Sequence, residues 1–192
     1  RLGSMFGSDH YGMTPDLITI AKGLTSAYAP LSGVIVGDRV WKVLEQGSDE
    51  LGPIGHGWTY SAHPLCAAAG LANLALIDRE GLIDNAREVG SYFQRCLHEA
   101  FDDHPIVGDV RGEGLLAALE FVHDKDGPVF FNPSLKVGPQ VAAAALEEGL
   151  IGRAMPEGDI LGFAPPLCLK REEVDRIVEM TRAAVDRVAG TL

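Results

Sequence analysis

The chain has 192 residues, of which 46% are hydrophobic and 22% are charged, and its formal net charge at pH 7 is -11. This composition excludes an intrinsically disordered chain and suits a globular protein with one or two hydrophobic cores. The acidic balance argues against a nucleic-acid or anionic-membrane surface, because both need a basic patch.

The chain alternates short apolar runs with helical patterns, which is typical of βαβ construction, and we expect two unequal parts, the first of which ends near Ile77. In chain order we expect a buried strand at residues 17–20, a strand at 33–36, a helical turn at 38–46, a glycine-rich loop at 52–57 and a helix from 64 to a stop at 81. Pro64 suits the first turn of that helix, because its missing N–H would have no partner there. These strands should complete a larger sheet.

The second part predicts a smaller α+β unit. In chain order we expect a helix at residues 82–101, a hairpin at 107–121 that turns at 112–114, an alanine-rich helix at 136–149, paired strands at 150–154 and 160–163, and an amphipathic helix at 171–189. The glycines at the hairpin turn match neither a dinucleotide-binding fingerprint nor a P-loop, so we interpret them as a turn.

The three cysteines, Cys66, Cys96 and Cys168, are far apart and form no C-x-x-C pair. This spacing argues against a disulfide framework or a zinc site and favours a reducing compartment. No apolar run is long enough to cross a bilayer, and the chain has no signal-like start. We therefore expect a cytoplasmic protein.

A single lysine, Lys22, stands directly after the apolar strand at 17–20 and is followed by Gly23. Open α/β sheets bind ligands beyond the carboxyl ends of their strands. Burial there disfavours the charged form of an amine and leaves it free to attack an aldehyde. The alternative is a solvated surface lysine, which is the more common case for this residue type.

The loop GHGWTYSAHP at residues 55–64 combines small residues, hydroxyls and a helix start, which together suit an anion site. The alternative is that Thr59 and Ser61 cap the helix. Trp58 either lines a substrate cavity or packs within the protein. His56 and His63 have no third ligand at a suitable spacing, so we do not expect a metal site.

Arg153 lies between Gly152 and a turn that contains Pro156 and Gly158. A guanidinium offers two parallel N–H donors that match a carboxylate, so Arg153 is a candidate for binding an acidic substrate. The alternative is an exposed arginine on an edge strand.

Three segments carry a family resemblance: DLITIAKGLTSAYAPLSG at 16–33, GHGWTYSAHP at 55–64 and ILGFAPPLCL at 160–169. In order and spacing they resemble the class III aminotransferases, which are fold-type I enzymes that use pyridoxal phosphate. The resemblance is closest to amine or ω-amino acid:pyruvate transaminases. It implies an α/β fold in which residues 1–77 belong to the large cofactor-binding domain with its mixed sheet and residues 78–192 form a small α+β C-terminal domain.

The resemblance also implies a role for each candidate residue. Lys22 would form the Schiff base with pyridoxal phosphate and then move a proton on the substrate. Thr59 would bind the cofactor phosphate of the neighbouring subunit, so that a homodimer shares its active sites, and Trp58 would line the substrate cavity across that interface. Arg153 would pair with the carboxylate of the keto acid and swing away for an uncharged amine donor.

In the family, the opening residues of this chain follow a D-E-V-x-x-G-F-G-R segment, so we expect the C-terminal part of a longer protein. The aspartate for the pyridinium nitrogen, the Gly-Ser phosphate cup and the ring-stacking aromatic would all precede Arg1, and the chain alone should be inactive. For the complete protein we expect amino transfer from an amine or ω-amino acid to pyruvate. Alternatives are an aminomutase, racemase or decarboxylase of the same fold, or a non-catalytic fragment that binds a partner.

Overall fold

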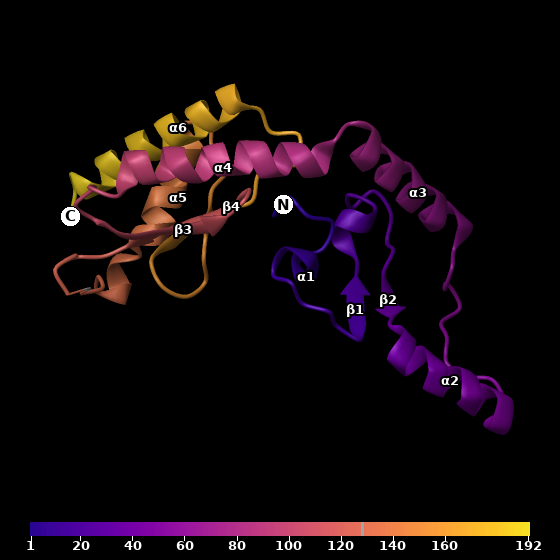
Figure 1. The fold of residues 1–192 in the computed structure, drawn as a ribbon. Coiled ribbons are helices and arrows are strands. Elements are labelled where there is room, and N and C mark those ends of the chain that lie inside the picture. Colours follow the sequence, from indigo (N-terminus) through magenta and orange to yellow (C-terminus); the bar gives the residue numbers. More distant parts are fainter. Residues whose placement is uncertain (128) are drawn as a thin grey trace. The chain divides into compact units, whose positions relative to one another are not determined.

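The computed structural model describes residues 1–127 and 129–192 and divides the chain into two compact units. One unit comprises residues 6–81, and the other comprises residues 82–192 together with residues 1–5. Both units combine helices with strands, as Figure 1 shows, and the expected mixed α/β class is confirmed.

The 6–81 unit is built on a two-stranded sheet. Its elements are α1 (Gly7–His10), β1 (Leu17–Ile20), the 3₁₀ turn η1 (Lys22–Leu24), β2 (Gly33–Val36), α2 (Asp38–Leu51) and α3 (Pro64–Arg79). Pro64 begins α3 as expected. Gly81, with a φ of 60°, follows the helix end in a left-handed conformation that glycine adopts without steric cost.

The prediction of βαβ construction is wrong for the described strands, because every pairing among them is antiparallel. In the 6–81 unit, Leu17 lies opposite Val36 and Ile20 lies opposite Gly33. A parallel neighbour needs a long crossover connection, usually a helix. The chain between β1 and β2 contains only a 3₁₀ turn, so it reverses direction and pairs antiparallel.

Helix α2 is longer than expected, because it continues past Gln46 to Leu51. Gln46 Nε2 donates a hydrogen bond to Glu50 Oε1 at 2.8 Å, which supports the last turn. Gly52 then ends the helix with a φ of 91°.

The unit of residues 82–192 is a four-stranded antiparallel sheet with the strand order β3-β4-β6-β5. Its elements are α4 (Leu82–Phe101), β3 (Val107–Glu113), β4 (Leu116–Phe121), η2 (Pro133–Leu135), α5 (Val137–Glu147), β5 (Arg153–Ala154), β6 (Ile160–Phe163) and α6 (Arg171–Ala189). Residues 1–5 belong to this unit because Leu115 N–H donates to the Arg1 carbonyl at 2.9 Å and Arg87 Nη2 donates to the Gly3 carbonyl at 2.6 Å.

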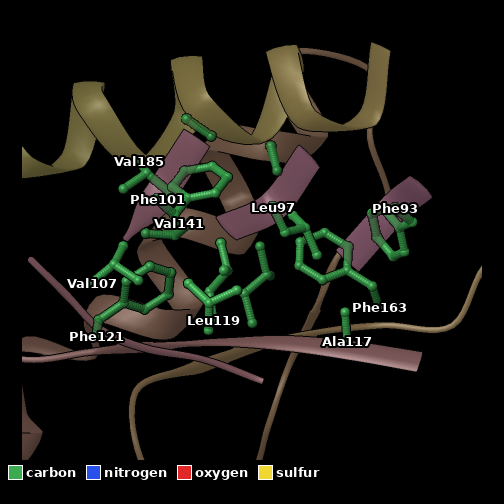
Figure 2. Close-up of a cluster of buried hydrophobic side chains, with 14 of the residues drawn as sticks. Phe93, Leu97, Phe101, Val107, Ala117, Leu119, Phe121, Val141, Phe163 and Val185 are labelled. Carbon is green, nitrogen blue, oxygen red and sulfur yellow. The ribbon is translucent and has the colours of Figure 1, made fainter. Parts of the chain in front are cut away.

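The hydrophobic core of this unit lies between its helices and one face of the sheet (Figure 2). Alternate residues of β4, namely Ala117, Leu119 and Phe121, are buried because successive side chains of a strand point to opposite faces. The rings of Phe93 on α4 and Phe163 on β6 pack edge to face, with their centroids 5.9 Å apart. The apolar stripe of α4 therefore fixes that helix over the sheet.

The β3–β4 turn lies directly against α4. A Cβ atom added to Gly90 would come within 2.6 Å of the Gly114 carbonyl carbon, so only glycine fits at this contact. Gly114 has a φ of 57° and connects the two strands, which confirms the prediction of a turn between strands in this glycine-rich stretch.

Two elements of this unit, α5 and β5, are shorter than expected. Helix α5 begins at Val137 because Lys136 has a left-handed backbone with a φ of 52°. Strand β5 covers only Arg153–Ala154. Before it, Gly152 passes so close to Leu161 that an added Cβ would lie 2.8 Å from Leu161 Cδ1.

We predict that Leu97→Ala destabilises the complete protein, because Leu97 is fully buried in this core. The lost transfer free energy and the cavity should lower the free energy of unfolding by about 2–5 kcal/mol, measured by urea denaturation. Leu146→Ala on α5 is the matched control, because Leu146 is 60% exposed. An equal loss of stability in both variants would contradict this assignment of the core.

Candidate functional site

The residue before β1 anchors that strand to the start of α2. Gly37 N–H donates to the Asp16 carbonyl at 2.8 Å, and Arg39 Nε donates to Asp16 Oδ1 at 2.8 Å. Arg39 Nη2 also donates to Asp16 Oδ2, so the ion pair is bidentate. The hydrogen bonds from Arg39 lower the pKa of the Asp16 carboxyl group.

Lys22 lies just beyond the carboxyl end of β1, as the first residue of η1. Its backbone is left-handed, with a φ of 50°. The expectation of a buried strand and a desolvated lysine is wrong for the residues of this chain, since Leu17 is 54% exposed and Lys22 is exposed. The physical reason is that β1 has only β2 beside it in the sheet.

The turn after Lys22 is fixed from within and from α3. Thr25 is buried, and its Oγ1 donates to the Ala29 carbonyl at 2.6 Å. Asn73 of α3 donates from Nδ2 to the Gly23 and Leu24 carbonyls at 2.8 and 3.2 Å. Sequence reasoning missed Asn73, because no motif or local pattern connects it with residues fifty positions earlier.

Asn73 lies on the covered face of α3. Gly70, Asn73 and Ile77 are less exposed than most of the helix, and they follow the spacing of one helical face. A Cβ atom added to Gly70 would come within 3.0 Å of Leu31 Cδ2 and 3.8 Å of the Leu24 carbonyl oxygen. The missing side chain at Gly70 therefore lets the α3 backbone approach the turn after Lys22.

The loop before α3 presents its side chains to solvent. Thr59 is exposed, and within the described part of the chain its hydroxyl group has no hydrogen-bond partner. Trp58 is 75% exposed and packs edge to face on His56, with the ring centroids 4.8 Å apart. Both residues are therefore available to a ligand or to another protein surface.

The capping alternative for this loop is wrong. His63 is the N-cap residue of α3, and no side chain caps that helix. Ser61 Oγ instead accepts a hydrogen bond from Trp58 N–H at 3.2 Å, which closes the turn before the helix. Nδ1 of His63 is buried without a hydrogen-bond partner among the described atoms. In the described ranges no group of three or more His, Cys, Asp or Glu side chains could hold a metal ion.

Arg153 lies on β5, the edge strand of the four-stranded sheet, directly opposite Gly162. Its side chain is exposed, and among residues 1–127 and 129–192 no ion pair of its guanidinium is found. Gly162 itself has no side chain, although Met155 Sδ lies 3.3 Å from the place of a Cβ atom there, and Leu161 and Phe163 on either side of Gly162 are buried in the core. The guanidinium can therefore change its orientation at the sheet edge without displacing a cross-strand neighbour.

The candidate residues are distributed over the two units. Lys22, Trp58 and Thr59 belong to the 6–81 unit, whereas Arg153 belongs to the 82–192 unit. Within the first unit an exposed amine lies in the turn that α3 covers, and an exposed indole and hydroxyl lie in the loop before α3. A primary amine can form a Schiff base with an aldehyde, and a hydroxyl can donate to a phosphate oxygen.

The sequence and fold match one family. The model of the class III aminotransferases matches residues 1–185. The chain is 68% identical over its whole length to a diaminobutyrate–2-oxoglutarate transaminase of Halomonas elongata, and it covers 41% of that protein. It is 39% identical to a putrescine–pyruvate aminotransferase of Pseudomonas aeruginosa, again with 100% of this chain and 41% of the relative covered.

A solved structure from work on the directed evolution of transaminases by ancestral reconstruction superimposes with a TM-score of 0.98 and 70% identity. The match covers 100% of this chain and 42% of that one. The chain belongs to the class III aminotransferase family. Members of this family depend on pyridoxal phosphate, and the structural relatives have the fold-type I architecture.

The chain spans about two fifths of the length of these relatives, at 41% of each curated one. None of the described helices is both long and apolar enough to span a membrane.

Proposed function

We propose that the complete protein is a pyridoxal-phosphate-dependent transaminase that moves an amino group from an amine or ω-amino acid to a keto acid, with pyruvate as the acceptor. The observation that carries this proposal is the exposed amine of Lys22 on a left-handed residue at the end of β1, within a chain of the class III family. Residues 1–77 are assigned to the large domain and residues 78–192 to the small C-terminal domain.

The residues of the chain fit the proposed cofactor. Lys22 supplies a primary amine for an aldehyde. Thr59 supplies a hydroxyl group that has no hydrogen-bond partner among the described residues and can donate to a phosphate oxygen. When bound, pyridoxal phosphate supplies an electron sink for the substrate carbon. Lys22 would hold the cofactor and, when released by the substrate, would accept and return a proton at its Nζ atom.

The 6–81 unit exposes a large apolar surface, which the rest of the complete protein and a second subunit would cover between them. Aromatic and aliphatic side chains of the kind that normally form a hydrophobic core are exposed to solvent in this unit. Large exposed apolar patches mark interaction surfaces. The most exposed are Tyr28, Leu51, Trp58, Tyr60, Leu65 and Leu71. We propose that a second subunit covers part of this surface, that Thr59 reaches the cofactor phosphate of that subunit, and that Trp58 lines the substrate cavity.

Pyruvate is the proposed acceptor, and 2-oxoglutarate is the alternative. The aminotransferase of Pseudomonas aeruginosa is named for pyruvate, whereas the more similar transaminase of Halomonas elongata is named for 2-oxoglutarate. Both keto acids carry the carboxylate that Arg153 would bind.

The free cysteines Cys66, Cys96 and Cys168 support our proposal of a reducing cytoplasmic compartment.

We predict that borohydride treatment of the complete protein with pyridoxal phosphate attaches the cofactor to the peptide that contains Lys22. In Lys22→Ala this adduct should be absent, and amino transfer to pyruvate or 2-oxoglutarate should fall by about 10²–10⁴-fold, the contribution of a positioned proton-transfer group. Lys42→Ala is the matched control, because Lys42 is an exposed lysine on α2.

The same assay separates the alternatives. An adduct at Lys22 without transfer of an amino group to either keto acid would indicate an aminomutase, racemase or decarboxylase. The absence of any adduct in the complete wild-type protein would indicate a non-catalytic protein.

We predict that Thr59→Ala weakens cofactor binding by roughly tenfold, the effect of losing one hydrogen bond to a charged group. Cofactor titration by fluorescence measures the change, and Thr14→Ala is the control at an exposed threonine. At limiting cofactor, a mixture of Lys22→Ala and Thr59→Ala subunits should regain activity, because one site of each mixed dimer combines both intact residues. No recovery in proven mixed dimers would contradict shared sites.

We predict that Arg153→Ala raises the KM for the keto acid by roughly 10–100-fold, which corresponds to losing a charge-assisted hydrogen bond. The KM for an uncharged amine donor should change by about twofold or less, because the amine does not use the guanidinium. Steady-state kinetics with both substrates measures this difference. Arg176→Ala, an exposed arginine on α6, controls for the change in net charge. Equal effects on both KM values would rule out the proposed role.

A further inference from the structure

The segment after β1 has an unusual backbone. Lys22, Ser26 and Ala27 all have positive φ angles, of 50°, 50° and 64° respectively, although none of them is glycine. Side chains with a Cβ atom are disfavoured in this region, and such a residue stays there only where the surrounding structure holds it. Something outside the local sequence must therefore hold the backbone on which Lys22 stands.

Asn73 supplies that restraint with every polar atom of its side chain. Nδ2 donates to the carbonyls of Gly23 and Leu24, at 2.8 and 3.2 Å, and Oδ1 accepts from Ser26 Oγ at 2.7 Å. The orientation of the amide follows from its partners, since a flipped amide would place its oxygen against two carbonyl oxygens. The Asn73 amide thus binds the residue after Lys22, the next one and the left-handed Ser26.

Other contacts fix the same segment to α3. Gly70, one turn before Asn73, lets the helix approach Leu31 and the Leu24 carbonyl. Thr25 N–H donates to the Lys22 carbonyl at 3.3 Å, and Leu24 N–H donates to the Ala21 carbonyl at 3.1 Å. The amides of Leu24 and Thr25 therefore report whether the turn is closed.

Resting on the proposed function, we propose that Asn73 is a positioning residue for Lys22. Its two hydrogen bonds to the Gly23 and Leu24 carbonyls hold Lys22 in the left-handed conformation. This conformation sets the direction in which the Lys22 side chain projects from the backbone. Without them, Lys22 would relax to a negative φ, and its Nζ atom would move by the rotation of the whole side chain. A displacement of about 1 Å at a reacting group can cost roughly 10²-fold in rate.

The chain offers a matched control in the other unit. Asn85 of α4 is half-buried like Asn73, and its Nδ2 also donates to two carbonyls, those of Leu167 and Leu169, at 2.6 and 3.0 Å. Asn85→Asp and Asn73→Asp both place a carboxylate against two carbonyl oxygens, so they share the general cost of that change. Only Asn73→Asp removes the restraint on Lys22.

The experiment uses the complete protein and two readouts. Hydrogen exchange of the peptide that covers residues 21–29, measured without cofactor, reports opening of the turn independently of activity. Steady-state kinetics with an amine donor reports kcat and KM. We expect Asn73→Asp to speed this exchange and lower kcat, each by roughly 10–100-fold, while KM changes by about twofold or less. Asn85→Asp should leave both readouts within about twofold of the wild type.

Two further variants keep the test decisive if Asn73→Asp does not fold. Asn73→Ala removes all three hydrogen bonds without adding a charge, and Ser26→Ala removes only the bond to Oδ1. The exchange rate and the loss of kcat should be larger for Asn73→Ala than for Ser26→Ala, because the proposal assigns the restraint to the carbonyl bonds.

Equal effects of Asn73→Asp and Asn85→Asp on kcat, or unchanged exchange at residues 21–29 in Asn73→Ala, would overturn the positioning role. Borohydride trapping of the wild-type protein separates this failure from failure of the proposed function. If the wild type traps no pyridoxal phosphate on Lys22, the proposed function is wrong and the positioning role falls with it. If trapping succeeds and the Asn73 variants behave like the control, only the positioning role is wrong.

Discussion

The left-handed turn after β1 is the constraint on which the candidate site depends. Three residues other than glycine occupy a disfavoured backbone region there, and one of them is Lys22. The turn persists because α3 lies against it, through the missing side chain of Gly70 and the amide of Asn73. The bidentate pair of Arg39 and Asp16 fixes the other end of β1. The lysine is thus presented by packing and hydrogen bonding that come from distant parts of the chain.

The two units are stabilised in different ways. Residues 82–192 bury a continuous apolar core between three helices and a sheet, and phenylalanines of α4 and β4 are its largest fully buried side chains. Among residues 6–81, all of which the structure describes, only Thr25, Gly70 and Ile77 are buried. The candidate cofactor residues therefore lie in the unit that exposes the most apolar surface, as suits a site completed by further protein.

The position of Arg153 is compatible both with a surface arginine and with an arginine that binds substrate. It is an exposed arginine on an edge strand, which was the alternative to a substrate role. The same position gives a guanidinium freedom to move, because its cross-strand neighbour is Gly162 and its strand is only two residues long. A side chain that must bind a carboxylate in one half of a reaction and leave in the other needs such freedom, whereas a buried ion pair would hold it in place.

The sequence by itself determined the mixed α/β class, the long helices and the position of Lys22 at the end of a strand. These follow from periodicity, from glycine and proline at the element ends, and from motifs that are local in the chain. The tertiary structure decided that β1 and β2 pair antiparallel, that Lys22 is exposed on a left-handed residue, and that Asn73 holds its turn. Strand direction and hydrogen bonds between residues fifty positions apart depend on how the chain reverses and packs, which no local pattern records.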